Sequence, residues 1–239
     1  MRLPASLVTV GAWAFADSAL SGNITLEKIR EIGMFAFAGS AVLGVTLGKK
    51  LESVSRAAFS KCEKLRKVVL GASVHKIEDE AFAECKSLLD VSLCHVVSIG
   101  SKAFYGCTSL QSASLDELEW LGESAFEKCG ILRVVTFGNM LTVIPELAFA
   151  GCEELYKINL PSGIEKIGNR AFAGTAMKKL ELRIPSSLVA VGEHVFENAD
   201  SPIVCVADGQ TDSWHPNWKL NCKRHGLLYL SRKVTTKKL

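Results

Sequence analysis

Residues 99–115 read Ile-Gly-Ser-Lys-Ala-Phe-Tyr-Gly-Cys-Thr-Ser-Leu-Gln-Ser-Ala-Ser-Leu, and this pattern of residue types recurs along nearly the whole chain. Its landmark is a Phe that returns every 22 to 24 residues, at Phe15, Phe37, Phe59, Phe82, Phe104, Phe126, Phe149, Phe172 and Phe196. Ala precedes the Phe in eight copies, and Val195 precedes it in the ninth. A fixed period of this length is typical of solenoids, whose stacked coils share one continuous core because no single repeat can bury its own apolar side.

The residues around each Phe predict which side chains form this core. Eight and five residues before the Phe, every copy carries Leu, Ile or Val, as at Val96 and Ile99. After the Phe comes Leu-x-x-Val-x-Leu, as at Leu65, Val68 and Leu70, and this alternation predicts a half-buried strand. Gly stands four residues before the Phe in six copies, where we expect the chain to bend at positive φ.

The unit I-G-x-x-A-F-x-x-C-x-x-L-x-x-V-x-L, as in residues 99–115 and 144–160, resembles the BspA-like leucine-rich repeats, including the treponemal type. The resemblance spans residues 5–207. It implies a leucine-rich repeat solenoid, a curved β-rich α/β horseshoe with about nine coils. It also implies a surface, periplasmic or secreted protein used in interaction or adhesion by host-associated bacteria and some protists.

Motifs that would indicate an enzyme are absent from the sequence. It has no glycine-rich phosphate loop, no H-E-x-x-H and no G-x-S-x-G, and its five His residues occupy different positions of the repeat. We therefore predict a protein without catalytic residues, cofactor or metal. A catalytic pair assembled across coils remains an alternative.

Five of the eight cysteines recur once per coil, three residues after the Phe, at Cys62, Cys85, Cys107, Cys129 and Cys152. This recurrence favours a ladder of small buried side chains with free thiols over paired disulfides. Cys205, Cys222 and His225 could belong to a zinc site, but a fourth ligand and the usual spacing are missing.

We predict two segments, the solenoid over residues 1–207 and a C-terminal cap with a basic tail over residues 208–239. Trp214 and Trp218 are interpreted as lids on the last coil, with ligand-binding aromatics as the alternative. Seven Lys and Arg follow Asp212, and no acidic residue lies among them. Residues 1–218 therefore carry a net charge of about −4, although the whole chain has a net charge of +3. A total this small does not indicate nucleic acid as the main partner.

The sequence contains no run of 18 apolar residues, so we expect no membrane-spanning helix. Arg2 and the apolar residues up to Trp13 could pass for a short secretory signal. Because the same residues fall in phase with the repeat, we favour a first coil, and we see no convincing signal peptide.

The outward positions of the strand pattern predict a binding surface on the concave side of the solenoid. Their central column is Thr25, Thr46, Val69, Ser92, Ser114, Thr136, Asn159, Glu181 and, loosely assigned, Cys205. Small and weakly polar residues gather in the middle, and we call this set the trough: Val69, Gly71, Ser92, Cys94, Ser114, Val134 and Thr136. It could accept an apolar side chain or a small hydrophobic ligand. The alternative is a plain β-surface without a ligand.

Trp13 and Phe35 stand two residues before the repeat Phe, where other copies carry Glu80, Lys102, Arg170 or His194. Trp120 lies between the core residues Leu118 and Leu121 and should point outward. These three aromatics are contact candidates, because exposed apolar patches mark interaction sites. The leading hypothesis is a module that binds a protein of the host or cell envelope through its concave surface and an exposed end. The alternatives are binding of a small hydrophobic ligand in the trough, and a structural or self-assembly segment that associates through the N-terminal end.

Overall fold

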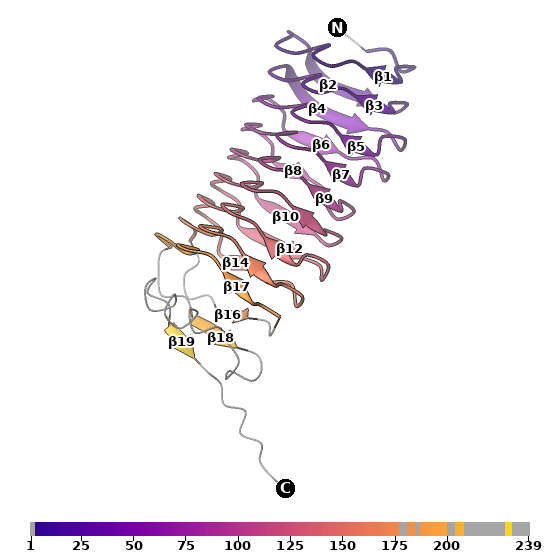
Figure 1. The fold of residues 1–239 in the computed structure, drawn as a ribbon. Helices are drawn as coiled ribbons and strands as arrows, with labels where there is room; N and C mark the ends of the chain where they lie inside the picture. Colours follow the sequence, from indigo (N-terminus) through magenta and orange to yellow (C-terminus); the bar gives the residue numbers. More distant parts are fainter. Residues whose placement is uncertain (1–2, 177–180, 185–186, 200–203, 208–227, 231–239) are drawn as a thin grey trace.

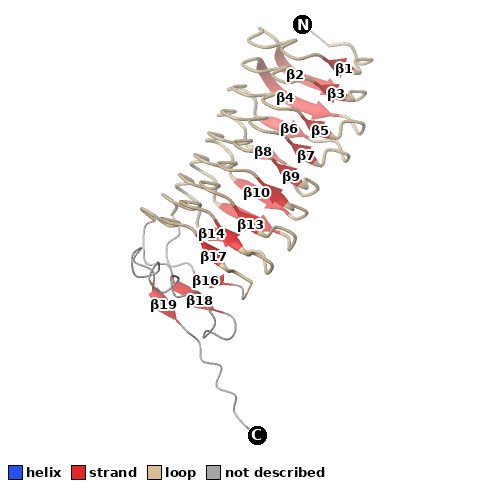
Figure 2. Ribbon diagram, in the orientation of Figure 1, coloured by secondary structure: helices blue, strands red, loops and turns tan. Residues whose placement is uncertain are grey.

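The chain forms a stack of β-coils, which runs as an elongated rod from the N-terminal coil (Figure 1). The structure, a computed structural model, describes residues 3–176, 181–184, 187–199, 204–207 and 228–230. Within these residues the regular elements are all strands, and none is a helix (Figure 2). The α/β part of the predicted fold class is therefore wrong, since turns replace the expected helices on this solenoid.

Two sets of strands line the rod. The long-strand sheet follows each repeat Phe and contains β2 (Ser21–Leu26), β4 (Ala41–Leu47), β6 (Lys67–Val69), β8 (Asp90–Val91), β10 (Ser112–Leu115), β12 (Val134–Phe137), β14 (Lys157–Ile158), β16 (Glu181–Ile184), β18 (Val204–Ala207) and β19 (Leu228–Leu230). The short-strand sheet precedes each Phe and contains β1 (Thr9–Val10), β3 (Glu31–Ile32), β5 (Ser53–Val54), β7 (Lys76–Ile77), β9 (Ser98–Ile99), β11 (Trp120–Leu121), β13 (Val143–Ile144), β15 (Lys166–Ile167) and β17 (Ala190–Val191).

All strand pairs are parallel, and their register follows the repeat. Thr46 pairs with Val69 and Ser114 with Thr136, as the central column predicts. The last step of that column is wrong, because β16 and β18 pair Glu181 with Val204 and Leu182 with Cys205. The segment predicted as a cap is described only at β19, which extends the sheet beside β18. Trp214 and Trp218 lie outside the described residues.

A ladder of nine phenylalanine rings runs along the rod; eight of them belong to the buried core, and Phe15 in the first coil is half-buried against it. Successive rings from Phe15 to Phe196 lie nearly parallel, with centroids 5.1 to 5.6 Å apart. Phe104 is fully buried, and so are the Val96 and Ile99 positions of its coil. Burial of one Phe side chain stabilises the folded state by about 1.5–3 kcal/mol relative to leaving it exposed. Because each ring is covered by the rings of the neighbouring coils, this burial favours the regular stacking of the coils.

The corner around each Phe has a left-handed backbone conformation, which its residue types do not predict. Two residues before the Phe, φ is positive in all nine copies, from +51° at Ala57 to +61° at Trp13, and none of these residues is Gly. A second positive φ follows two residues after the Phe, as at Lys61 and Gly106. Each residue of the first kind from Trp13 to Arg170 donates its N–H to the next coil, as Lys102 does to the Glu123 carbonyl at 2.9 Å. These bonds offset the cost of the left-handed conformation.

The prediction that the Gly before the Phe bends the chain at positive φ is therefore wrong. None of these glycines has positive φ. At five of the six glycines the reason is the close approach of the coils, as a Cβ atom on Gly100 would lie 2.5 Å from the main-chain nitrogen of Asp79 in the preceding coil. Backbone atoms cannot move aside as a flexible side chain can. Gly11, in the first coil, has no such neighbour.

The short-strand sheet is interrupted between β3 and β5 and between β11 and β13. Where it is continuous, the residue four before the Phe donates its N–H to the preceding coil, as Gly100 does to the Ile77 carbonyl at 2.8 Å. At the second interruption this position is Pro145, which has no N–H to donate. At the first it is Ser55. Glu78 occupies the same position in the next coil and keeps its bond, to Val54.

Candidate functional site

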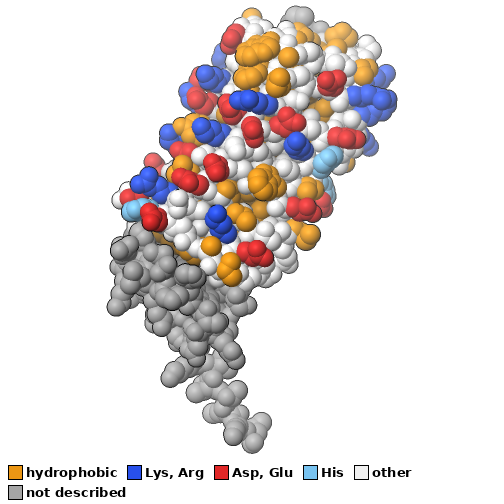
Figure 3. All heavy atoms as spheres, in the orientation of Figure 1, with side chains coloured by type: hydrophobic (Ala, Val, Ile, Leu, Met, Phe, Trp, Pro, Cys, Tyr) orange, Lys and Arg blue, Asp and Glu red, His pale blue; other side chains and the backbone are white. Residues whose placement is uncertain are grey.

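Trp13, Met34 and Phe35 form an exposed apolar surface at the first two coils, which we call the aromatic shelf. The rings of Trp13 and Phe35 are stacked with centroids 4.1 Å apart and planes 7° from parallel. Trp13 is 59% exposed and Met34 51%, while Phe35 is half-buried. Figure 3 shows hydrophobic side chains gathered near this end of the rod, with Lys, Arg, Asp and Glu mixed over the middle.

The shelf is held rigidly by the backbone beneath it. Trp13 and Phe35 both have positive φ, at +61° and +57°. The Trp13 N–H donates to the Met34 carbonyl at 3.0 Å, and the Phe35 N–H donates to the Arg56 carbonyl at 3.1 Å. Because one coil fixes the next, the two rings present a preformed surface and lose little conformational freedom on binding.

Trp120 points outward from β11, as predicted, and is 64% exposed. It lies beside the interruption between β11 and β13, where Val143 is also exposed. The third aromatic candidate is therefore several coils from the shelf, and the structure does not bring it together with Trp13 and Phe35.

The trough residues share one face, formed by the outward side chains of β6, β8, β10 and β12 and the turns that follow. Val69 is 41% exposed, Ser92 and Ser114 are exposed, and Cys94, Val134 and Thr136 are half-buried. The Thr136 hydroxyl donates to the Ser114 hydroxyl at 3.3 Å, and the Ser92 oxygen lies 3.4 Å from the Cys94 sulfur. The long-strand sheet is interrupted here between β8 and β10.

Gly71 has a structural reason to be small. A Cβ atom at this position would collide with the Gly48 carbonyl oxygen of the preceding coil, and Gly48 and Gly138 meet the preceding coil in the same way. Close stacking of coils therefore accounts for Gly71 without a ligand.

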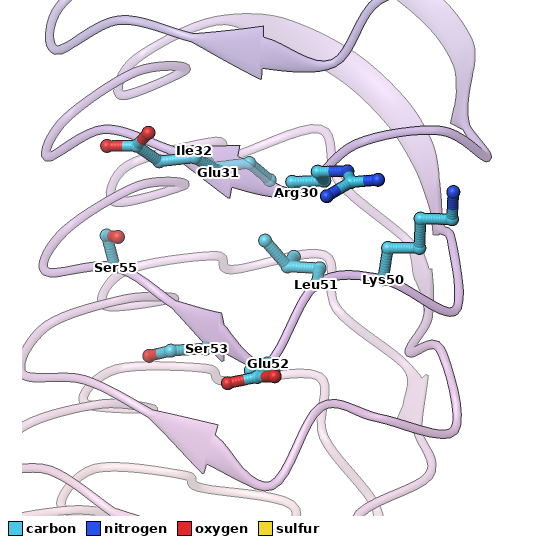
Figure 4. A pocket seen from close by; sticks show the side chains of 8 residues that line it. All are labelled: Arg30, Glu31, Ile32, Lys50, Leu51, Glu52, Ser53 and Ser55. Atoms are coloured by element: carbon cyan, nitrogen blue, oxygen red, sulfur yellow. The ribbon is translucent and has the colours of Figure 1, made fainter.

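Sequence reasoning missed a hollow of about 550 Å³ between coils two and three, at the interruption between β3 and β5. It is lined by Arg30, Glu31, Ile32, Lys50, Leu51, Glu52, Ser53 and Ser55. Figure 4 shows the Arg30 and Lys50 side chains together on one side, with Glu31 and Ser55 on the other. The one signal in the sequence was Ser55 in place of the recurrent Gly.

Two further hollows lie over the middle coils. One, of about 490 Å³, contains His75 and His95, and the Nδ1 atom of His95 lies 3.3 Å from the Glu117 carboxylate. The other, of about 350 Å³, is lined by Tyr105, whose hydroxyl accepts a hydrogen bond from Lys128 at 2.6 Å. This hydrogen bond raises the pKa of Lys128.

The cysteine ladder is buried, as predicted, and its thiols are free. Each thiol donates to the main-chain carbonyl of the Phe in the preceding coil, as Cys129 does to Phe104 at 3.2 Å. Burial raises the pKa of Cys62 to about 11 and that of Cys129 to about 12. A thiol kept protonated in this way is a poor nucleophile and a poor metal ligand.

Among the described residues, no three His, Cys, Asp or Glu side chains gather so that they could hold a metal ion. Cys222 and His225 of the suggested zinc fragment lie outside them. The described part of the chain also contains no helix long and apolar enough to cross a membrane.

The chain is similar to known leucine-rich repeat proteins. The model of the BspA type leucine-rich repeat region, with six copies, matches residues 1–98 and 94–202. No curated protein sequence matches the chain.

Three solved bacterial structures share the fold. A leucine-rich repeat protein of T. pallidum is 23% identical with a TM-score of 0.63, over 73% of this chain and 89% of that one. Proteins of Eubacterium ventriosum and Bacteroides ovatus are 17% and 21% identical, with TM-scores of 0.54 and 0.52. The alignments cover 89% and 97% of this chain, and 78% and 77% of theirs. The sequence match, which spans most of the chain, places this protein in the family of BspA type leucine-rich repeat proteins.

Proposed function

We propose that this chain is a non-enzymatic binding module that attaches to a protein of a host or of the cell envelope. Leucine-rich repeat solenoids are generally protein-interaction modules, because a stack of coils offers a long, rigid surface. The observation that carries the proposal for this chain is the aromatic shelf. The exposed Trp13 and the half-buried Phe35 present stacked rings on a rigid corner.

Aromatic side chains with an exposed apolar neighbour are typical of the centres of protein interfaces. Trp is among the residues that most often dominate binding energy, and Met adapts to irregular partner surfaces. We therefore place the principal contact at the shelf, with Trp120 as a separate contact farther along the rod. A second copy of this chain is the alternative occupant of the shelf.

The test uses fluorescently labelled chain and cultured epithelial cells, with binding measured by flow cytometry. We expect saturable binding that protease treatment of the cells abolishes, and a loss of at least tenfold in affinity for the double variant Trp13→Ser/Phe35→Ser, since hot-spot losses of 2 kcal/mol or more exceed that factor. Met140→Ser, at another exposed apolar residue, is the matched control and should bind normally.

Two outcomes would contradict the proposal. Normal binding by the double variant would remove the shelf as the contact. Failure of any saturable, protease-sensitive binding, together with dimerisation of the native chain that Trp13→Ser/Phe35→Ser abolishes in light scattering, would assign the shelf to self-association.

The trough supports a second candidate, a site for a small hydrophobic ligand. The specific observation is the exposed Val69 on β6, one strand before the interruption between β8 and β10. Val134→Arg or Ser114→Arg should abolish binding of a fluorescent hydrophobic probe with little change in stability, because both side chains lie on the outer side of their strands. If the native chain binds no probe, or only Trp13→Ser/Phe35→Ser loses it, the trough is a plain β-surface.

A further inference from the structure

The hollow between β3 and β5 contains main-chain groups that lack the partners of their counterparts in other coils. In the next coil, His75 and Lys76 both donate to the Glu52 carbonyl, at 3.1 and 3.3 Å. No backbone hydrogen bond joins described residues 52–55 to residues 30–33 in the same way. The N–H groups of Glu52, Ser53 and Ser55 and the carbonyl oxygens of Arg30 and Ile32 are thus left available for another partner.

The charged side chains of the hollow are also without ion pairs. Within the described part of the chain, Arg30, Glu31, Lys50 and Glu52 make neither a salt bridge nor a side-chain hydrogen bond. Elsewhere cations commonly pair across coils, as Arg133 does with Glu154 at 2.7 Å. The two cations of the hollow lie together, and the carboxylates lie to the other side and below them (Figure 4).

This arrangement defines the chemistry of a ligand. Arg and Lys side by side favour a carboxylate, and Arg can hold one through two parallel hydrogen bonds. Glu31 and Glu52 balance the charge of Arg30 and Lys50, so the hollow has no net positive charge that would favour a small multiply charged anion such as phosphate. Carboxylates and free carbonyl oxygens instead accept hydrogen bonds from hydroxyl groups, while the Ser55 hydroxyl and the main-chain N–H groups donate to them. The Ser53 hydroxyl already donates to the Glu78 carboxylate at 3.2 Å.

We propose that the hollow between coils two and three binds an acidic sugar, with its carboxylate at Arg30 and Lys50 and its hydroxyls at Glu52, Ser55 and the unpaired main-chain groups. A volume of about 550 Å³ accommodates one such ring, since ligand pockets span about 300–1,000 Å³. A peptide with acidic and basic side chains would pair with the four charged side chains. It offers fewer hydroxyl groups for the unpaired main-chain donors and acceptors between β3 and β5. The site does not include the residues of the aromatic shelf, so a failure of the proposed protein interaction would not contradict it.

The experiment titrates ¹⁵N-labelled full-length chain with sodium glucuronate, and with glucose, acetate and a Lys-Glu dipeptide as comparison probes. We expect glucuronate to shift the amide signals of Glu52, Ser53 and Ser55, and to bind at least tenfold more tightly than the other three. Arg30→Gln or Lys50→Gln should lower glucuronate affinity about tenfold, the loss of roughly one charge-assisted contact. Arg66→Gln, an exposed Arg outside the hollow, is the matched control and should bind normally.

Three results would overturn the assignment. Acetate binding as tightly as glucuronate would indicate a simple anion site, and tighter binding of the dipeptide would indicate a peptide site. Absence of shifts at residues 52–55 with glucuronate at tens of millimolar would show that water alone occupies the hollow. Folding of each variant is checked by its dispersed amide spectrum.

Discussion

The thiol of Cys107 donates a hydrogen bond of 3.1 Å to the main-chain carbonyl of Phe82, 25 residues earlier in the chain. The relationship recurs from coil to coil, so each thiol links the corner of its own coil to the corner beneath it. These cysteines are therefore structural residues whose chemistry is suppressed by their place in the core.

Alkylation should distinguish the ladder from the rest of the chain. Under native conditions iodoacetamide should leave Cys62, Cys85, Cys107, Cys129 and Cys152 unmodified, because they are buried and protonated. After unfolding without a reductant, all five should be modified. Mass spectrometry that finds Cys62 bridged to Cys85, or Cys107 to Cys129, would contradict this expectation.

The same thiols predict how stability depends on pH. Below pH 9 they are protonated in both states and have no effect. Above it the unfolded chain loses protons that the folded chain keeps, because burial raises the thiol pKa values to about 11 for Cys62 and about 12 for Cys129. Stability should therefore fall from pH 9 to about 12, by at most about 1.4 kcal/mol per pH unit for each thiol. Urea titrations at several pH values measure the free energy of unfolding, which should fall less steeply with pH for Cys129→Ala than for the native chain. An equal fall in both proteins would show that the Cys129 thiol is not a cause of the pH dependence.

The phenylalanine ladder predicts a sharp contrast within one coil. Phe104→Ala should lower the free energy of unfolding by about 3–5 kcal/mol, because it leaves a cavity between two stacked rings. Lys102→Ala should be nearly neutral, since this side chain is exposed. Chemical denaturation measures both changes, and equal losses would mean that the assigned register is incorrect.

Close approach of the coils predicts which glycines can be replaced. Gly100→Ala should destabilise by about 1–3 kcal/mol, because its methyl group would meet the backbone of Asp79. Gly130→Ala should be tolerated, since a Cβ atom there has no neighbour within 4 Å and its φ is not positive. Thermal denaturation compares the two, and tolerance of Gly100→Ala would show that the coils can separate there without cost.

The sequence was sufficient for the repeat, its core and most of its register, because the period fixes which residues share a column. The last step failed, since Glu181 pairs with Val204 and not with Cys205. Trp120 was correctly predicted to point outward, from its place between Leu118 and Leu121. The left-handed conformation of the corner could not be predicted from the sequence, since Lys102 and Trp13 have positive φ but are not residue types that favour it. The true reason for Gly100 was hidden as well, because it depends on the spacing between coils.

Only one of the two interruptions of the short-strand sheet could be predicted from the sequence. Pro145 removes a donor, which its residue type alone reveals. Ser55 and Glu78 occupy equivalent positions, yet only Glu78 keeps its bond to the preceding coil. The hollow beside Ser55 required the stacked coils to be seen together, because Arg30 and Lys50 come from different repeats.

The location of the native protein tests the proposed attachment to a host or envelope protein most directly. Intact source cells are treated with a protease, fractionated and probed with an antibody against the chain. The proposal predicts that the protein is degraded on intact cells or recovered outside the cytoplasm. Full protection in intact cells, with recovery only in the cytoplasmic fraction, would contradict it.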